Sequence, residues 1–410
     1  MSVYIKYFLF FFLFVLIQYV EGMPAIGGVS VMQLWKMPIL LYLLYVVYKN
    51  DRKWFPFEKY SYLYSVENFF CPAIISNPFS IIIHASKQLP MVLFFNFWIT
   101  RYHKRVNVLE TILFSLAQFI SLVSLLCLLG IVKPIESYKL ADAYGADAIY
   151  YSALFGAVHA ASSYFCIALF VLLFGFKSGR FVSSLQKVYN TFLIIVLLYS
   201  LYKSFVRTGW IMFGLGCFVM FFNKESFNIK KLIRYVFVLS IVGFCCVWLY
   251  NTSPTLRGRL TEKTVYNKSS EVNVNGSGRL MFWTISLSNY AKNDVYGLFF
   301  GKGYDAVVDD MRKEAGRRVF SHNHFVDTLA QYGLIGLILL LGYFYSIYRY
   351  IVRCGRDSPY YLLAKVMFIS YFVFAFLQNE MYFWYAVIFS ICLVLLSLKK
   401  EDYNSNYVLG

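Results

Sequence analysis

Charged residues are scarce in this sequence of 410 residues: 14% are Asp, Glu, Lys or Arg, whereas 60% are hydrophobic. A typical soluble domain carries about a quarter charged residues, because its surface must be hydrated. The shortage of charge therefore excludes an ordinary soluble enzyme. Repeated apolar runs of bilayer-spanning length instead predict an all-α, polytopic integral membrane protein.

Cysteine is uncommon as well, and its eight residues follow no recognisable pattern. No Cys-x-x-Cys pair or paired Cys and His spacing occurs, and the long polar stretch of residues 251–321 has no cysteine. Disulfides and a zinc site are therefore not expected. The adjacent pair Asp309-Asp310 suggests another cation site, but one pair without further ligands is typical of a solvated loop. We predict that the protein needs neither a metal nor a cofactor.

The apolar runs predict about twelve transmembrane helices when they are compared with a span of about 20 residues. Their centres lie near residues 12, 40, 68, 93, 120, 164, 194, 215, 242, 336, 371 and 390. Polar residues interrupt the third and fourth runs, so a broken or re-entrant segment over 60–100 also fits. We expect an N-terminal transmembrane bundle over 1–250, a large polar loop over 251–321, C-terminal helices over 322–400 and a tail over 401–410.

Acidic residues are fewer than basic ones, 21 against 38, which gives a net charge of +17. The basic residues of the short loops fall on alternate sides of successive predicted helices, so they share one face. They cluster near residues 49–59, 101–105, 177–187, 224–234, 349–356 and 399–400. By the positive-inside rule this face is cytoplasmic. Both termini are then cytoplasmic, the long loop lies outside the cytoplasm, and nucleic-acid binding is not needed to explain the charge.

Two arginines stand apart from this topological pattern. Arg207 lies in a tight outer hairpin between two apolar helices, where a charge is costly unless it faces a polar cavity or reaches lipid phosphate. Arg279 follows a Gly/Ser stretch at the start of a predicted helix, and such a helix start is a natural anion-binding site. An arginine in the first turn is unfavourable against the helix dipole. We interpret both residues as candidate anion ligands.

The segment Ser321-His322-Asn323-His324-Phe325 ends the long polar stretch where it meets the next apolar helix. An imidazole at such a border can act as a base near neutral pH. We therefore favour His322 as the catalytic base. Asn323 either orients the histidine or caps the helix, and His324 is a candidate helper.

Two carboxyl groups are weaker candidates. Asp327 follows His324 by three positions, so the two can share a helix face. Asp327 could then hold an imidazole tautomer, cap the helix or pair with an arginine. Glu380 lies on the outer side, between the last two predicted helices.

The spacing of His322-Asn323, nine residues, Gly333, two residues and Gly336 resembles the signature of the bacterial O-antigen polymerase and O-antigen ligase superfamily. Gly333 and Gly336 are expected to let their helix pack closely against a neighbour. Three further segments resemble marks of the same superfamily: the hairpin 204–210, Gly278-Arg279 with Trp283, and the glycine-rich turn 301–304. The resemblance covers about residues 190–345, whereas the N-terminal half agrees in hydropathy alone.

This resemblance implies a GT-C-like glycosyltransferase of the bacterial inner membrane with its active site facing the periplasm. Such an enzyme passes a glycan from undecaprenyl diphosphate to a hydroxyl group of a second molecule. Arg207 and Arg279 would then bind the diphosphate and His322 would be the base, without a metal. The implied partners are a lipid-linked donor and acceptor, membrane lipids and a chain-length regulator.

An O-antigen or related surface-polysaccharide polymerase is the favoured member, on the high aromatic content and the divergent N-terminal half. An O-antigen ligase, which delivers the glycan to lipid A-core, is the alternative. A lipid-linked oligosaccharide flippase is a further one. A transporter should show repeated halves and charges near the midplane of the membrane, and the sequence shows neither.

Overall fold

The computed structural model describes residues 36–50, 52–76, 87–134, 150–155, 157–221, 251–252, 279–316, 318–355, 358–378 and 382–397. All elements named in these ranges are helices, which agrees with the expected all-α class. They are α3 (Lys36–Tyr48), α4 (Pro56–Glu67), η2 (Asn68–Phe70), α5 (Ala73–Ser76), α7 (Leu89–Tyr102), α8 (Val106–Leu128), α9 (Val158–Lys177), α10 (Ser184–Lys203), α11 (Arg207–Phe221), α14 (Arg279–Ala291), α15 (Val295–Phe300), α16 (Tyr304–Ala315), α17 (His324–Gly355), α18 (Tyr361–Leu377) and α19 (Phe383–Leu396).

Four of these helices, α8, α9, α10 and α17, are long and apolar enough to cross a bilayer. Four shorter apolar helices accompany them: residues Pro38–Tyr48 of α3, together with α11, α18 and α19. The protein is therefore a polytopic, membrane-embedded helical protein. The expected spans centred near residues 12 and 242, and most of the expected outer loop, lie outside the described residues.

The predicted span centred near residue 68 is not one continuous helix, which agrees with the alternative of a broken segment over 60–100. Helix α4 ends at Glu67, and the chain continues as the short helices η2 and α5. Pro72 contributes to the break, because proline has no N–H to donate within a helix. Glu67 and Asn68 are buried inside the protein, so these polar side chains do not face lipid. The broken segment packs against α17 instead: the hydroxyl groups of Tyr64 and Thr328 lie 3.1 Å apart.

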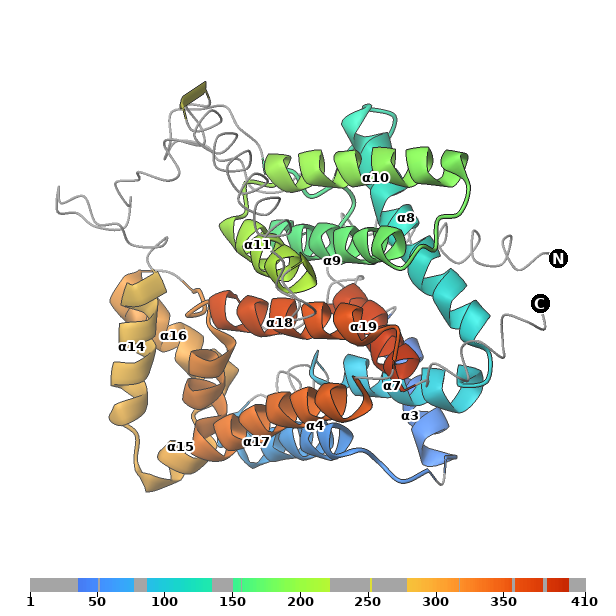
Figure 1. Cartoon of the computed structure of the whole chain (residues 1–410). Coiled ribbons are helices and arrows are strands. Elements are labelled where there is room, and N and C mark those ends of the chain that lie inside the picture. Colours follow the sequence, from blue (N-terminus) through green and yellow to red (C-terminus); the bar gives the residue numbers. More distant parts are fainter. Residues whose placement is uncertain are drawn as a thin grey trace, which may run out of the picture.

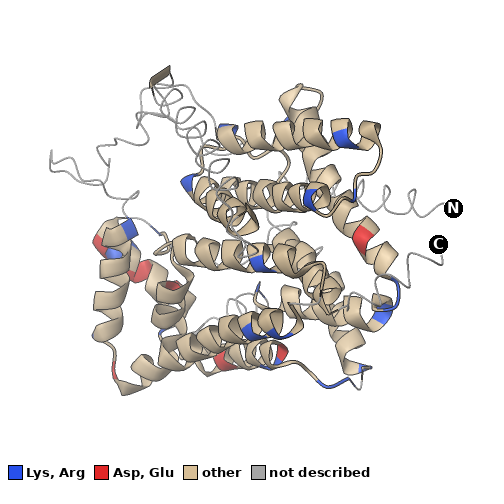
Figure 2. Ribbon diagram, viewed as in Figure 1, with Lys and Arg blue, Asp and Glu red and all other residues tan. Residues whose placement is uncertain are grey.

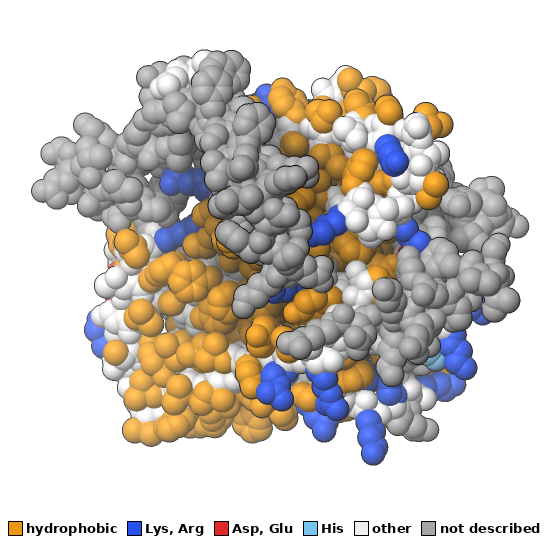
Figure 3. Space-filling view, in the orientation of Figure 1, with side chains coloured by type: hydrophobic (Ala, Val, Ile, Leu, Met, Phe, Trp, Pro, Cys, Tyr) orange, Lys and Arg blue, Asp and Glu red, His pale blue; other side chains and the backbone are white. Residues whose placement is uncertain are grey.

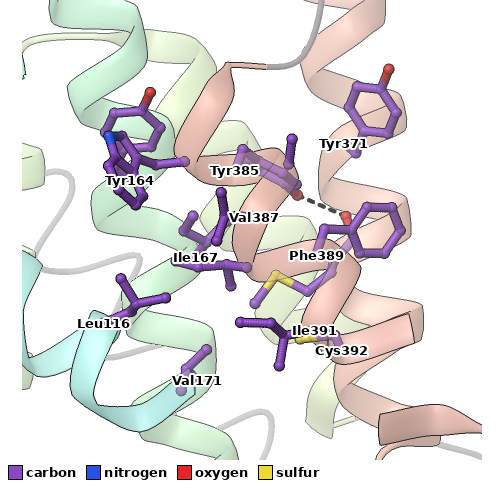
Figure 4. Close-up of a cluster of buried hydrophobic side chains, with 14 of the residues drawn as sticks. Leu116, Tyr164, Ile167, Val171, Tyr371, Tyr385, Val387, Phe389, Ile391 and Cys392 are labelled. Atoms are coloured by element: carbon purple, nitrogen blue, oxygen red, sulfur yellow. Dashed lines mark hydrogen bonds between the residues drawn. The ribbon is translucent and has the colours of Figure 1, made fainter. Parts of the chain in front are cut away.

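Among the described helices, α9 and α19 are the most completely buried, and side chains of both contribute to the hydrophobic cluster in Figure 4. Every residue of α19 is buried, although its sequence contains no helical alternation of polar and apolar positions. A helix that is apolar all round is expected in such a position. Tyr385 donates its buried hydroxyl proton to the backbone oxygen of Met367 at 2.7 Å, which fixes α19 against α18.

Figure 1 shows α9, α10 and α18 crossing the molecule side by side, with α14 and α16 standing across one end. A glycine pair attaches this end to the bundle. Gly333 (φ 66°) interrupts α17, and an added Cβ there would lie 2.3 Å from the backbone carbon of Phe299. Gly301, at the end of α15, approaches the backbone of Gln331 equally closely. Gly333 thus gives the close packing expected of it by leaving helical geometry, which only glycine does without strain.

The other end of the bundle carries paired charges. Arg180 forms an ion pair with the buried Glu110, and Arg52 pairs with the buried Glu58 at 2.6 Å. Lys177 is the last residue of α9 there, about 29 Å by helical rise from the start of that helix. Figure 2 shows basic residues at both ends of the molecule, and Figure 3 shows hydrophobic side chains covering much of the side between them, including the region of α14, α15 and α17.

Candidate functional site

Four helices begin and one ends at a single place, although they are far apart in the sequence. Helices α9, α11 and α14 begin there, and α17 begins directly after the segment that contains His322. Helix α18 ends there at Leu377. The first N–H groups of a helix have no partner within it, so its start carries partial positive charge. Four such starts make this end of the bundle favourable for an anion.

Arg207 and Arg279 are the first residues of α11 and α14. Arg279 donates from Nη2 to the hydroxyl oxygen of the buried Thr208 at 3.4 Å, which joins the two helix starts. Burial, and then the positive charge of Arg207, lower the pKa of Arg279 to about 10. A bound dianion would stabilise the positive charge of Arg279 that burial and Arg207 disfavour.

His322 lies in a tightly held turn between this pair and α17. Its φ of 57° is left-handed, a conformation that costs a histidine energy unless its surroundings impose it. The preceding Ser321 supplies that restraint: its carbonyl oxygen accepts from Trp283 Nε1 at 2.8 Å, and its N–H donates to Asp327 Oδ1 at 3.0 Å. The ring of Phe282 lies 6.4 Å from the imidazole. Helix α14 therefore both carries Arg279 and covers His322.

The imidazole of His322 is neutral at ordinary pH. Burial, and then the positive charge of Arg279, lower its pKa from 6.5 to about 4, while a side-chain hydrogen bond with Gln378 opposes that shift. Nδ1 of His322 is buried, and no described residue offers it a hydrogen-bond partner. A neutral ring with an unused lone pair is in the correct state to accept a proton.

The supporting residues predicted from the sequence have different positions in the structure. Asn323 Oδ1 accepts from the N–H groups of Phe325 and Val326, so the side chain caps α17. His324 is buried, and its Nε2 lies 3.1 Å from Nε2 of Gln88, beside α7. Asp327 holds the turn through Ser321, as described above. Glu380 lies outside the described residues.

Three further residues, Thr208, His159 and Gln378, complete the cluster and were not among those expected from the sequence. Gln378 Nε2 lies 3.1 Å from Nδ1 of His159 and 3.2 Å from the hydroxyl oxygen of Thr208. The imidazoles of His159 and His322 are 6.3 Å apart, centroid to centroid. One signal was available: His159 and Gln378 flank apolar helices on the side that the charge pattern assigns to the outside.

Metal ligands are not gathered here, since no group of three His, Cys, Asp or Glu residues occurs at ligand spacing within the described part of the chain. The acidic pair on α16 is engaged in ion pairs. Asp309 lies 3.1 Å from Arg318, and Asp310 lies 3.5 Å from Lys302 and 3.7 Å from Lys313. The site thus offers anion-binding groups and one proton acceptor.

Comparison with known proteins identifies a family for part of the chain. Residues 192–341 match the family described as O-antigen ligase. That segment contains Arg207, Arg279 and His322 together with the kink at Gly333. No curated protein matches the chain. Over residues 192–341, the chain therefore carries the domain of the O-antigen polymerase and O-antigen ligase superfamily.

Proposed function

We propose that this protein is a polymerase of O-antigen or a related surface polysaccharide, a GT-C-like glycosyltransferase of the bacterial inner membrane. The cluster around His322 would face the periplasm, and both termini would be cytoplasmic. The donor would be a growing glycan on undecaprenyl diphosphate and the acceptor a hydroxyl group of an incoming lipid-linked repeat unit. A chain-length regulator is a further expected partner.

The observation that carries this proposal is the convergence of Arg207, Arg279 and a neutral His322 at one end of a membrane-embedded bundle. A sugar diphosphate already has a good leaving group, so its transfer needs charge neutralisation more than a strong acid. Guanidinium groups bind phosphate oxygens through paired hydrogen bonds, which suits Arg279 and Arg207. An acceptor hydroxyl is a poor nucleophile, and a neutral imidazole can remove its proton as it attacks.

The proposed reaction is a single displacement. The acceptor oxygen forms a bond to the anomeric carbon of the donor sugar as the bond from that carbon to the diphosphate oxygen breaks. The hydroxyl proton passes to His322, and undecaprenyl diphosphate leaves with the bonding electron pair, with its charge held by the arginines. The protonated His322 then returns its proton to water. No step requires a metal ion, because two guanidinium groups supply the positive charge.

An O-antigen ligase is the second candidate, favoured by the description of the matching family. It would use the same donor and the same three residues but deliver the glycan to lipid A-core. A flippase is less well supported, because the notable charged groups lie at one end of the bundle rather than at its middle.

A lipopolysaccharide gel of a strain that lacks this gene separates these functions. Loss of a polymerase leaves single repeat units on lipid A-core. Loss of a ligase removes even those units and leaves the glycan on its undecaprenyl carrier. Complementation with Arg279→Ala or His322→Ala, at membrane levels matched by immunoblot, should reproduce the deletion pattern. Normal long chains in His322→Ala would refute the proposed role of the base.

A further inference from the structure

We propose that Gln378 is a positioning residue that connects Arg279 to the base and selects the ring nitrogen of His322 that accepts the proton. This inference rests on the proposed function and goes beyond it, because it gives roles to Gln378, His159 and Thr208. Thr208 lies in α11, His159 lies in α9 and Gln378 directly follows α18, whereas Arg279 begins α14 and His322 precedes α17.

The amide of Gln378 is 2% exposed, so each of its polar atoms needs a partner inside the protein. An amide nitrogen has two protons and only donates. Nε2 of Gln378 has two acceptors within reach, Nδ1 of His159 and the hydroxyl oxygen of Thr208. His159 consequently carries its lone pair on Nδ1, and its ring proton is on Nε2.

The carbonyl oxygen of Gln378 is then the atom left for His322. The hydrogen bond between the two side chains favours the protonated imidazole, as expected if the ring donates to an oxygen. Nδ1 of His322 has no hydrogen-bond partner among the described residues. We therefore assign the donating N–H to Nε2, held by Gln378 Oε1. Nδ1 is the nitrogen that accepts the proton of the acceptor hydroxyl.

This arrangement couples diphosphate binding by Arg279 to the orientation of the imidazole of His322. Thr208 accepts hydrogen bonds from both Gln378 and Arg279, so one chain of contacts runs from the guanidinium through Thr208 and Gln378 to the imidazole. A diphosphate that draws Arg279 toward itself acts on the residue that orients the base. His159 braces the other side of the amide, and its ring stands beside that of His322.

Purified protein in liposomes, supplied with lipid-linked repeat units extracted from a strain that lacks the gene, tests the assignment. Gln378→Leu should lower kcat about a hundredfold with little change in KM, because a misplaced base affects the transition state more than substrate binding. Gln378→Glu keeps the shape and adds a negative charge, so the acidic limb of the pH profile should move to higher pH. A purely structural role would leave that limb in place.

Within the described residues, the charged or titratable groups around His322 include Arg279 on α14, Arg207 on α11, His159 on α9 and Asp327 on α17. Of these, His159 contacts the amide of Gln378 directly, with its Nδ1 3.1 Å from Gln378 Nε2, so it has its own pair of variants. His159→Asn keeps an acceptor near the position of Nδ1 and should retain most of the activity. His159→Leu removes that acceptor and should lose about tenfold.

Gln118→Leu is the matched control. It removes a comparable side-chain hydrogen bond, from Gln118 Nε2 to Asn190 Oδ1 at 3.0 Å, on the side of α8 that faces α10. It should leave kcat and the pH profile unchanged. If Gln378→Leu does not accumulate in the membrane, Gln378→Glu carries the test, because it preserves the size and shape of the side chain.

Two results would overturn the inference: wild-type kcat in Gln378→Leu, or a wild-type acidic limb in an active Gln378→Glu protein. Activity in His322→Ala would instead refute the proposed function. An inactive His322→Ala protein together with wild-type behaviour of both Gln378 variants would refute the role of Gln378 alone.

Discussion

Arg279 should control the pH at which the enzyme loses activity, in addition to binding the diphosphate. The pKa of His322 is lowered to about 4 by burial and then by the positive charge of Arg279. The base form of His322 is the neutral imidazole. The value of kcat/KM should therefore be constant at higher pH and fall as the pH drops through the pKa of His322 in the free enzyme.

Replacing Arg279 by Gln removes the positive charge and keeps a side chain that can donate a hydrogen bond. The imidazolium form of His322 then becomes less unfavourable, so its pKa rises and the acidic limb moves to higher pH. The limb should stay below pH 6.5, because burial is the larger cause of the shift and it remains. At pH 7.5 the rate should also fall by about a hundredfold to a thousandfold, the usual effect of losing one group that stabilises developing negative charge.

Reconstituted protein, assayed for glycan elongation between pH 4 and 9, provides the measurement. Arg279→Lys is the control, because it retains the charge but lacks the fork-shaped pair of donors. Its acidic limb should remain near that of the wild type although its rate is reduced. An unchanged limb in Arg279→Gln, or a limb displaced to lower pH, would show that the guanidinium does not act on His322 in the way described.

Four other outcomes are expected. His322→Gln should lose about a hundredfold to ten-thousandfold in kcat, as expected for a general base, with unchanged membrane levels by immunoblot. Arg207→Lys should retain more activity than Arg207→Ala in the same elongation assay, because charge is kept while bidentate binding is lost. Gly333→Ala should lower the free energy of unfolding of the purified protein by about 2 kcal/mol or more, because its Cβ would meet the backbone of Phe299 at a positive φ. Gly214→Ala is the control and should have no such effect, because the space around Gly214 is open. Treatment with EDTA should leave the elongation rate unchanged, and a loss restored by Mg²⁺ would contradict a transfer that relies on arginine.

The proposed polymerase and ligase activities share one chemistry, so the variants of Arg207, Arg279 and His322 cannot separate them. The acceptor does separate them, because a repeat unit is carried on a polyprenyl chain and lipid A-core is not. The gel of the deletion strain reads out that difference directly. The positioning role proposed for Gln378 holds for either acceptor, since it concerns the proton of the attacking hydroxyl.

Local properties of the chain were enough to predict its class and to select three residues that the fold brings together. The length and apolarity of the runs predicted a helical membrane protein, because each backbone group in lipid must be satisfied within its own helix. Arg207 and Arg279 stood out because charge beside hydrocarbon needs a reason, and His322 stood out through its spacing from Gly333. These features depend on neighbours in the sequence, which can be read without knowing the fold.

Tertiary packing decided the rest. Gln378 meets His159 and Thr208 across sequence separations of 219 and 170 residues, and no local pattern encodes such a contact. The helical break at Gly333 likewise depends on the backbone of Phe299 at the end of α15. The low pKa of His322 follows from burial and from Arg279 on a different helix. Hydrogen bonds and charge interactions act over a few ångströms in space, so only the folded arrangement of the helices determines which distant residues share them.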